Sequence, residues 1–311
     1  MLKNYNKIDK KVAISVLIPV YNGEKVIETC ITSVLASSIE DYEVLIIDDC
    51  SSDASIAKLK RYLSDKVLLI RNNRNKGFVK TIKIGIKRAR GDIIVLLNMD
   101  TIVERNWLEE LVKPLYNCDN TGITGSKIYY IDGVTIQHAG GFLDEIARSY
   151  HVGRGEVEHG QYDMCSEVEY VCGASLAFRK ELLEKIGELD SGFSPAYYEE
   201  ADFAMRSRRA GYKILYVPAS KLRHYECYST MAIFFYYISK NRLRFAIKHY
   251  PVKKLIGAFI KGEMKFFMEN DIANRKKLLK AYFYTLFRLP EIILVRLKER
   301  IPHPHVIEKI S

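Results

Sequence analysis

The sequence predicts an α/β protein whose mostly parallel central sheet carries helices on both faces and is followed by a helical C-terminal region. Short runs rich in β-branched residues alternate with segments whose apolar residues recur at helical spacing. The runs are apolar at nearly every position, which is typical of strands buried on both faces in parallel sheets. Strands are predicted at 13–18, 44–47, 67–70 and 93–97, and later at 214–217.

Helices are predicted between these strands and after them. Apolar side chains recur at helical spacing over 26–35 and 82–89, and Gly91 follows the second of these helices as a C-terminal cap. From 122 to 171 the pattern loosens into short strands and a long polar loop. Further helices are predicted at 182–186, closed by Gly187, and from 199 to 211.

Length, cysteines and charge limit the class of protein. A chain of 311 residues is long enough for one large domain with an appendage, and we expect a folded domain over 1–228 and a basic, aromatic helical tail over 229–311. The six cysteines form no C-x-x-C pair, the N-terminus is polar, and no apolar run reaches about 18 residues. We therefore expect a cytoplasmic protein without a disulfide framework, zinc ribbon, signal peptide or spanning helix. The net charge of +10 suits phosphate-bearing partners.

Polar side chains follow three of the predicted strands where each strand ends: Tyr21-Asn22, Asp48-Asp49 and Asn98-Met99-Asp100. Ligands of open α/β sheets bind beyond the carboxyl ends of the strands, so these clusters are expected to converge on one crevice. An alternative interpretation is helix capping. It explains Ser51, Ser52 and Asp53, but it explains less well why two adjacent carboxylates end a buried strand.

Asp100 is a candidate ligand for a hard divalent cation, Mn²⁺ or Mg²⁺, because it would stand where a diphosphate arrives at the sheet edge. The alternative is a strand-end turn capped by Asp100 or Thr101. His224 ends the last predicted strand. A lone histidine is more often structural, but a neutral imidazole beside a metal-bound diphosphate can complete the coordination shell.

Two adjacent carboxylates, Glu199 and Glu200, open a predicted helix. Acidic residues in a first turn often only complement the helix dipole, and on this segment alone we favour that interpretation. Adjacent carboxylates also raise one another's pKa, which suits a general base that works near neutral pH. The sequence contains neither a G-x-x-x-x-G-K-[ST] loop nor a G-x-G-x-x-G motif after the first strand, so phosphate charge would fall to a metal and to basic side chains.

Taken in order, these clusters resemble the family 2 glycosyltransferases, whose catalytic domain has the Rossmann-like GT-A fold. The resemblance covers roughly residues 13 to 226, and the order of the motifs makes it specific. The motifs are Ser15 to Asn22, Val44 to Asp49 with Ser51-Ser52-Asp53, Asn75 to Phe78, Leu96 to Asp100, Cys172-Gly173-Ala174 and Tyr198 to Asp202.

The resemblance implies an inverting transfer of a sugar from a nucleoside-diphosphate donor, of the UDP, dTDP or GDP type, to an acceptor hydroxyl. Asp100 would hold the divalent metal that bridges the two phosphates, and His224 would be a further ligand. Glu200 would be the catalytic base, with Glu199 as the fallback. The nucleotide pocket would be lined by Pro19, Tyr21, Asn22, Asp48, Asp49, Lys76, Gly77, Asn98 and Met99, with a carboxylate of the Asp48-Asp49 pair on the base or ribose.

Three positions depart from the family pattern. The metal motif begins with Asn98 rather than Asp, so Asp100 alone would carry the charge there. Lys83 stands where relatives often have Asn, and it could contact a phosphate. Glu200 replaces the more usual Asp and has a longer arm.

A looser likeness concerns the acceptor side. Gln137 to Gly141, with His151 and the stretch 160–163, resembles the bacterial branch of the family that builds cell-surface polysaccharides, including rhamnosyltransferase-like members. This region is expected to face a glycan or lipid-linked acceptor.

The residues after 229 mix aromatic side chains with Lys and Arg. One interpretation is a set of helices that pack on the catalytic domain with a solvated basic face. Another is an interfacial surface that attracts anionic lipid headgroups and keeps the protein on the inner face of the cell membrane. The segment Tyr237 to Tyr250, with Asn241, Arg242 and Arg244, is then expected nearest the membrane. A third is pairing with another subunit in a homo-oligomer.

Other functions stay open from the sequence alone. A metal-dependent nucleotidyltransferase shares the sheet edge but would carry a Gly/Arg/Lys-rich loop after the first strand, of which Asn22 to Lys25 is a poor version. A glycosidase would use two carboxylates but leave the nucleotide pocket without a purpose. A catalytically inactive binding protein of this fold is opposed by the intact set of Asp49, Asp100 and Glu200. A nucleic-acid-binding protein would carry its charge on the folded domain, so no nucleic-acid partner is expected.

Overall fold

The computed structural model describes residues 12–226 and 231–300, and it has the predicted α/β fold class. Most of its strands belong to one ten-stranded sheet, and β8 and β9 form a separate hairpin. The strands are β1 (Ile14–Val20), β2 (Tyr42–Asp48), β3 (Val67–Arg71), β4 (Ile93–Leu97), β5 (Thr101–Val103), β6 (Thr121–Tyr130), β7 (Ile136–His138), β8 (Gly141–Leu143), β9 (Ser149–His151), β10 (Ser166–Glu167), β11 (Ser175–Arg179) and β12 (Lys213–His224).

The hydrogen-bonded order of the large sheet is β10-β12-β6-β11-β4-β1-β2-β3, with β5 paired to β12 and β7 paired to β6. The β1–β2, β1–β4, β2–β3 and β6–β12 pairs are parallel, whereas β11 runs antiparallel to both β4 and β6. The parallel strands β1 to β4 therefore bring their carboxyl ends to one edge of the sheet. This is the edge at which the sequence places its polar clusters.

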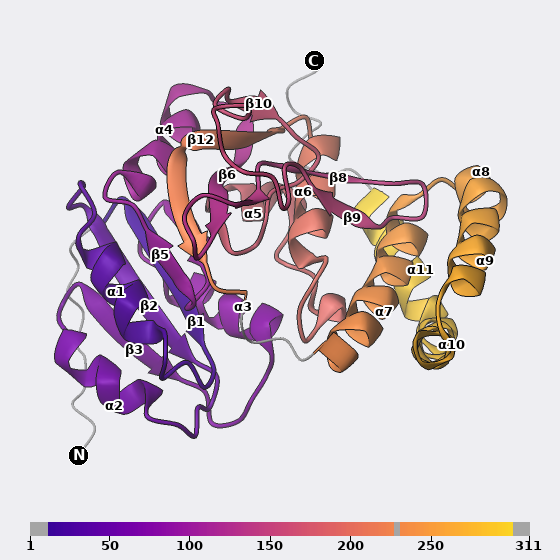
Figure 1. The fold of residues 1–311 in the computed structure, drawn as a ribbon, viewed down its shortest axis with the longest axis horizontal. Helices are drawn as coiled ribbons and strands as arrows, with labels where there is room; N and C mark the ends of the chain where they lie inside the picture. The colour runs from indigo at the N-terminus through magenta and orange to yellow at the C-terminus, as the bar shows by residue number, and fades with distance from the viewer. Residues whose placement is uncertain (1–11, 227–230, 301–311) are drawn as a thin grey trace.

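Helices follow and separate these strands (Figure 1). The predicted helices over 26–35, 82–89, 182–186 and 199–211 are all present. The helix α4, with buried Trp107, was not predicted, although its apolar residues recur at helical spacing on both sides of Pro114. The helices are α1 (Ile27–Leu35), α2 (Ser55–Leu59), α3 (Phe78–Arg88), α4 (Trp107–Asn117), α5 (Leu182–Ile186), α6 (Glu199–Arg209), α7 (Met231–His249), α8 (Val252–Lys254), α9 (Ile260–Glu269), α10 (Ile272–Phe287) and α11 (Leu289–Arg300), with short turns η1 (Lys60–Tyr62), η2 (Ser191–Phe193) and η3 (Leu255–Phe259).

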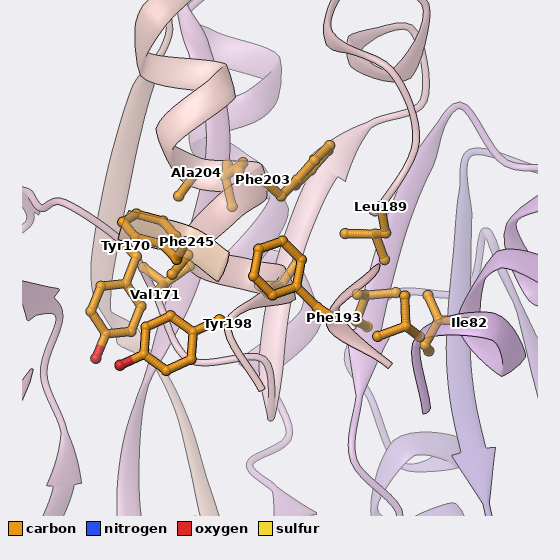
Figure 2. Close-up of a cluster of buried hydrophobic side chains, with 14 of the residues drawn as sticks. Ile82, Tyr170, Val171, Leu189, Phe193, Tyr198, Phe203, Ala204 and Phe245 are labelled. Carbon is orange, nitrogen blue, oxygen red and sulfur yellow. The ribbon is translucent and has the colours of Figure 1, made fainter. Parts of the chain in front are cut away.

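Two apolar cores form on the two faces of the sheet. One contains buried side chains of α1, α2 and α4, and the other contains buried side chains of α3, α5, α6 and α7. Figure 2 shows part of the second core, in which Phe245 of α7 lies near Tyr198, with ring centroids 5.9 Å apart. The first helix of the C-terminal region is thus part of the core that supports α6.

The basic side chains of α7 are buried rather than exposed to lipid. Asn241 and Arg242 are 0% and 1% exposed, and Arg244 is 5% exposed. Arg244 and Lys248 pair with Asp190 at 3.0 and 3.1 Å, and Lys248 also lies 2.6 Å from a carboxylate oxygen of Asp202 in α6. The expectation that Tyr237 to Tyr250 lies nearest a membrane was therefore wrong, because these cations neutralise carboxylates inside the protein.

The expected boundary at 228/229 falls within 227–230, outside the described residues, so the division into two domains stays a prediction. Among the described residues, no helix is both long enough and apolar enough to span a bilayer.

Candidate active site

The loops after β1 and β2 are joined to each other by hydrogen bonds. The backbone N–H groups of Asn22 and Gly23 donate to the hydroxyls of Ser51 and Ser55 at 3.0 and 2.8 Å. The Asn22 side-chain oxygen accepts from the Ser52 N–H at 2.9 Å. Asn22 and Cys50 have φ of 51° and 69°, a left-handed conformation that non-glycine residues adopt at a cost of about 1–3 kcal/mol. The serines considered as helix caps instead hold this strained loop pair together.

Asp48 and Asp49 are buried, and both carboxylates accept hydrogen bonds from the protein. Asp48 accepts from the Ser51 N–H at 3.0 Å and from Arg71 at 2.9 Å. Asp49 accepts from the Asn72 amide at 2.8 Å and from the backbone N–H groups of Lys76 and Gly77 at 2.9 and 2.8 Å. The pair thus orders the loop between β3 and α3, and its contact with a base or ribose stays a prediction.

The other residues predicted for the nucleotide pocket lie around the same edge. Tyr21 is 47% exposed, so much of its ring is open to solvent, whereas Pro19, Asn98 and Met99 are half-buried. A Cβ on Gly23 would lie 2.6 Å from the Met99 sulfur, so the loops that follow β1 and β4 are in contact.

A pocket of about 540 Å³ opens beside Lys76. Lys83, which departs from the family pattern, lies in it and pairs with Glu188 at 2.9 Å. The pocket is lined mainly by basic side chains: Arg74, Asn75, Lys76, Lys80, Lys83, Ile84, Lys87 and Ser191.

Asp100 and His224 are brought together although they are far apart in the sequence. The His224 Nε2 lies 3.1 Å from the Asp100 Oδ1, and both residues are buried. The His224 Nδ1 lies 2.8 Å from the Gln137 Oε1, an acceptor, so Nδ1 carries the proton and donates it. The Gln137 amide donates in turn to Glu226 at 3.4 Å, which fixes the orientation of the amide.

This arrangement fits a divalent cation. An imidazole whose only ring proton is on Nδ1 would present a lone pair on Nε2 toward the Asp100 carboxylate, and a cation bound between the two side chains would satisfy both atoms. A histidine ligand whose other nitrogen donates to a carbonyl is usual in metal sites. Among the described residues, no group of three or more His, Cys, Asp or Glu side chains could hold a metal. The protein would thus supply two ligands and leave positions for substrate phosphates, as Mg²⁺ sites often do.

Glu199 and Glu200 open α6, directly after two residues with left-handed backbone. Tyr197 and Tyr198 have φ of 80° and 72°. Burial, followed by the neighbouring charge of Glu200, holds the pKa of Glu199 well above its usual range. Burial raises the pKa of Glu200 to about 7. The pair therefore contains a carboxylate poised to exchange a proton near neutral pH.

Gly173 connects the carboxylate pair to the metal-binding candidates. A Cβ on Gly173 would lie 3.9 Å from the Glu200 Cβ, and the next residue, Ala174, accepts a hydrogen bond from the Asn98 N–H at 3.0 Å. The Cys172-Gly173-Ala174 motif thus lies between Asn98 and Glu200.

The region expected to face the acceptor contains a buried histidine pair. The Nδ1 atoms of His138 and His151 lie 2.8 Å apart, and the His138 Nε2 accepts from the Cys172 N–H at 3.1 Å. The proton of His138 therefore sits on Nδ1 and is donated to His151. Burial lowers the pKa of both residues, that of His151 to about 4, so both are neutral at pH 7.

Sequence reasoning missed several residues that order the site. Arg71 and Asn72 directly follow the predicted strand 67–70, so the strand-end argument applied to the other strands would have found them. Gln137 was expected on the acceptor side but contacts His224. Asn241 of α7 donates to the backbone carbonyls of Phe193, Ala196 and Tyr197 at 2.7 to 2.9 Å, in the loop that leads to Glu199. No local signal marks that role.

The fold and this site define a GT-A-type α/β protein. The chain belongs to the family described as "Glycosyl transferase family 2", whose profile matches residues 15–187. One relative, the O-antigen biosynthesis protein RfbC of Myxococcus xanthus, is 23% identical over 228 residues, which are 70% of this chain and 18% of RfbC. The aligned regions cover 24%, 37% and 40% of three further curated relatives.

Solved structures share the fold. GalNAc-T7, solved with UDP, GalNAc and Mn²⁺, has a TM-score of 0.66 at 22% identity, and the match covers 88% of this chain and 54% of that one. The mannosyltransferase PcManGT of Pyrobaculum calidifontis, solved with GDP-Man and Mn²⁺, has a TM-score of 0.58 at 16% identity, covering 91% and 76%.

Proposed function

We propose that the protein is an inverting, metal-dependent glycosyltransferase that moves a sugar from a nucleoside-diphosphate sugar to an acceptor hydroxyl in cell-surface polysaccharide or glycolipid synthesis. One observation carries the proposal. The Asp100–His224 pair and the Glu199–Glu200 pair are joined through Asn98 and the Cys172-Gly173-Ala174 motif. The structural relatives solved with UDP or GDP-Man and Mn²⁺ support the donor class and the metal.

The donor is of the UDP, dTDP or GDP type, and its nucleotide occupies the edge beyond β1, β2 and β4. The exposed ring of Tyr21 offers a surface for the base. The other residues proposed to line the nucleotide pocket are Pro19, Asn22, Asp48, Asp49, Gly77, Asn98 and Met99. Lys76, in the basic pocket beside this edge, brings positive charge toward the phosphates.

Asp100 and His224 would hold Mn²⁺ or Mg²⁺ together with the donor phosphates. The bound cation offsets negative charge on the leaving diphosphate. Gln137 holds the His224 ring through its Nδ1–H and so keeps the Nε2 lone pair directed at the site.

Glu200 accepts the proton of the acceptor hydroxyl. The acceptor oxygen forms a bond to the anomeric carbon, while the bond from that carbon to the phosphate oxygen breaks. The electron pair of that bond leaves with the nucleoside diphosphate. Attack from the face opposite the leaving group inverts the anomeric configuration. A base with a pKa near 7 suits this role because it is partly ionised at neutral pH and still binds a proton.

The acceptor is a glycan or a lipid-linked glycan of the kind handled by the bacterial polysaccharide branch, including its rhamnosyltransferase-like members. The O-antigen role in the name of RfbC supports this assignment. A nucleotidyltransferase is disfavoured, since the N–H groups of Asn22, Gly23 and Glu24 donate to Ser51, Ser55 and Asp53 and are not free to cradle a phosphate.

The anomeric outcome tests the proposal. A panel of UDP-, dTDP- and GDP-sugars is incubated with the protein and Mn²⁺, with water as the acceptor, and the released sugar is followed by proton NMR. We expect one donor class to be hydrolysed, with the inverted anomer formed first, and no release by the Glu200→Gln variant. Release of the anomer with retained configuration, or no hydrolysis of any donor, would argue against an inverting transferase.

A further inference from the structure

Large apolar side chains are exposed on the helices that follow α7. Along η3 and α9, Ile256, Ile260, Met264 and Met268 recur every four residues, which places them on one side of the helix, and Ile256 is 69% exposed. Along α10, Ile272, Leu279, Phe283, Leu286 and Phe287 are spaced by one, three, four or seven residues, which also places them on one side of the helix. Phe283 and Phe287 are 72% and 84% exposed. We call the exposed sides of η3, α9 and α10 the α9–α10 surface.

The opposite sides of the same helices pack on the rest of the protein. Glu263 of α9 is bound by the buried Arg242 of α7, and its carboxylate also accepts from Tyr282 at 2.7 Å. Leu278 and Ala281 of α10 are buried. The helices are therefore held in place by contacts on one side, while the α9–α10 surface is left to a partner.

The charge on this surface is positive. Lys261 and Lys265 flank the apolar residues of α9, and Lys276 and Lys280 lie among those of α10. The acidic residues of this region have partners within the protein. Glu263 points inward to Arg242, and Asp271 accepts from the Asn274 N–H as the cap of α10. Glu269 lies 3.7 Å from Lys265 and offsets its charge, so the positive charge of the surface comes mainly from Lys261, Lys276 and Lys280. Exposed apolar stripes set among lysines are typical of helices that lie in a membrane interface.

We propose that the α9–α10 surface binds the interfacial layer of an anionic lipid bilayer. The apolar side chains would enter the boundary between headgroups and acyl chains, and the lysines would contact the headgroup phosphates. Large apolar side chains gathered on one exposed surface and set among charged residues mark an interaction surface. Lysines set among the apolar residues complement anionic headgroups at the depth where the apolar side chains enter the bilayer, which favours a bilayer over a second protein chain.

The position of the surface suits a membrane-bound acceptor, although the inference does not depend on the proposed sugar transfer. In Figure 1 the β8–β9 hairpin extends from the sheet side toward α8 and α9. It packs on α9, where a Cβ on Gly262 would lie 2.4 Å from Ile146, and it is joined to the site region by the Tyr170 hydroxyl, which donates to the Tyr150 carbonyl at 3.0 Å. Exposed rings of Phe142 and Tyr150 stack on this hairpin at 5.2 Å.

The test is co-sedimentation of the full-length chain with vesicles of phosphatidylcholine alone or mixed with phosphatidylglycerol. We expect retention on the mixed vesicles that weakens at high salt. The double variants Phe283→Ser/Phe287→Ser and Lys276→Glu/Lys280→Glu should each lose roughly tenfold or more in affinity. Exposed residues elsewhere provide matched controls that should bind as the wild type does: Tyr116→Ser/Val157→Ser and Lys60→Glu/Lys113→Glu.

Circular dichroism of the same variants, and their binding of whichever of UDP, dTDP and GDP the wild type binds, show whether they are folded. Folded Phe283/Phe287 variants that bind vesicles as tightly as the wild type would overturn the proposal, as would control variants that lose as much. The proposal would also be overturned if the wild type is a dimer that binds no vesicles and the Phe283→Ser/Phe287→Ser variant is a monomer. The surface would then be covered by a second copy of the chain. Loss of vesicle binding with nucleotide binding intact separates this inference from the proposed function.

Discussion

At the residue scale, burial is the main cause of the raised pKa values of the two carboxylates at the start of α6. The sequence suggested that Glu199 and Glu200 raise one another's pKa. Burial is the larger cause at Glu199, followed by the charge of Glu200, and the raised pKa of Glu200 comes from burial alone. Glu199 and Glu200 could be predicted as site residues from the sequence because they belong to a family motif. The sequence could not reveal their burial, which depends on packing against distant segments.

Glu200→Gln should reduce transfer by about 10²–10⁴-fold, as expected for loss of a general base. In the wild type, activity should rise with pH until about 7, because the base must be ionised. Folding stability should show the opposite trend. The raised pKa means that stability present at low pH is lost as pH rises through about 7, and glutamine removes this loss.

Thermal melts of both proteins at pH 5 and pH 8 provide the measurement. The variant should melt at a higher temperature than the wild type at pH 8 and show a smaller advantage at pH 5. A variant that is inactive but equally destabilised at both pH values would indicate a structural role instead. Glu199→Gln, on the neighbouring carboxylate, is the matched control for activity and should retain more transfer than Glu200→Gln.

Asp100 and His224 illustrate what a motif can predict and what it leaves out. Both were candidates from their positions at strand ends, and the structure brings them within 3.1 Å. Gln137 was placed on the acceptor side because its partner is 87 positions away in the sequence and no pattern links the two. Pairing of β7 with β6, next to β12, brings them together.

Gln137→Leu should weaken Mn²⁺ binding, measured with whichever of UDP, dTDP and GDP the wild type binds, by about 10–100-fold, since the His224 ring loses the acceptor that orients it. Electron paramagnetic resonance of free Mn²⁺ measures this without any turnover. Gln161→Leu, in an exposed loop, is the control and should bind Mn²⁺ normally. An unchanged affinity in Gln137→Leu would mean that His224 is held by other contacts or is not a ligand.

At the scale of elements, α7 is where sequence and structure differ most. A basic, aromatic helix has the same composition whether its cations face water, lipid or buried carboxylates. Here they face Asp190 and Asp202, which lie 58 and 46 positions before Lys248 and could not be paired with it from the sequence. The interfacial character expected of the tail is better matched by α9 and α10.

Asn241→Ala should lower the free energy of unfolding by about 1–3 kcal/mol, because it leaves buried carbonyls of the loop before Glu199 without a donor. Urea denaturation measures the change. Asn270→Ala removes a single hydrogen bond to Phe266 at the end of α9 and should have a smaller effect. Equal losses in the two variants would show that Asn241 has no special role in ordering that loop.

At the scale of the whole molecule, the fold class followed from the continuously apolar strands β1 to β4, because parallel strands buried on both faces leave a clear pattern. The antiparallel strand β11 and the long strand β12 were harder to predict. β12 alternates between buried and exposed positions and contains register shifts against β6, so only its apolar start at 214–217 was recognised. The sheet edge was predictable, but the support of α6 by α7 was not.

The most direct test of the central claim is calorimetric binding of UDP, dTDP and GDP to the full-length protein, with Mn²⁺ and then with EDTA. We expect one of the three nucleotides to bind in the presence of Mn²⁺, and binding to be lost with EDTA and in Asp100→Ala. Ser64→Ala, an exposed position away from the site, serves as the control. If none of the nucleotides binds with Mn²⁺, or if Asp100→Ala binds as tightly as the wild type, the sheet edge beyond β1, β2 and β4 is not a metal-dependent nucleotide site.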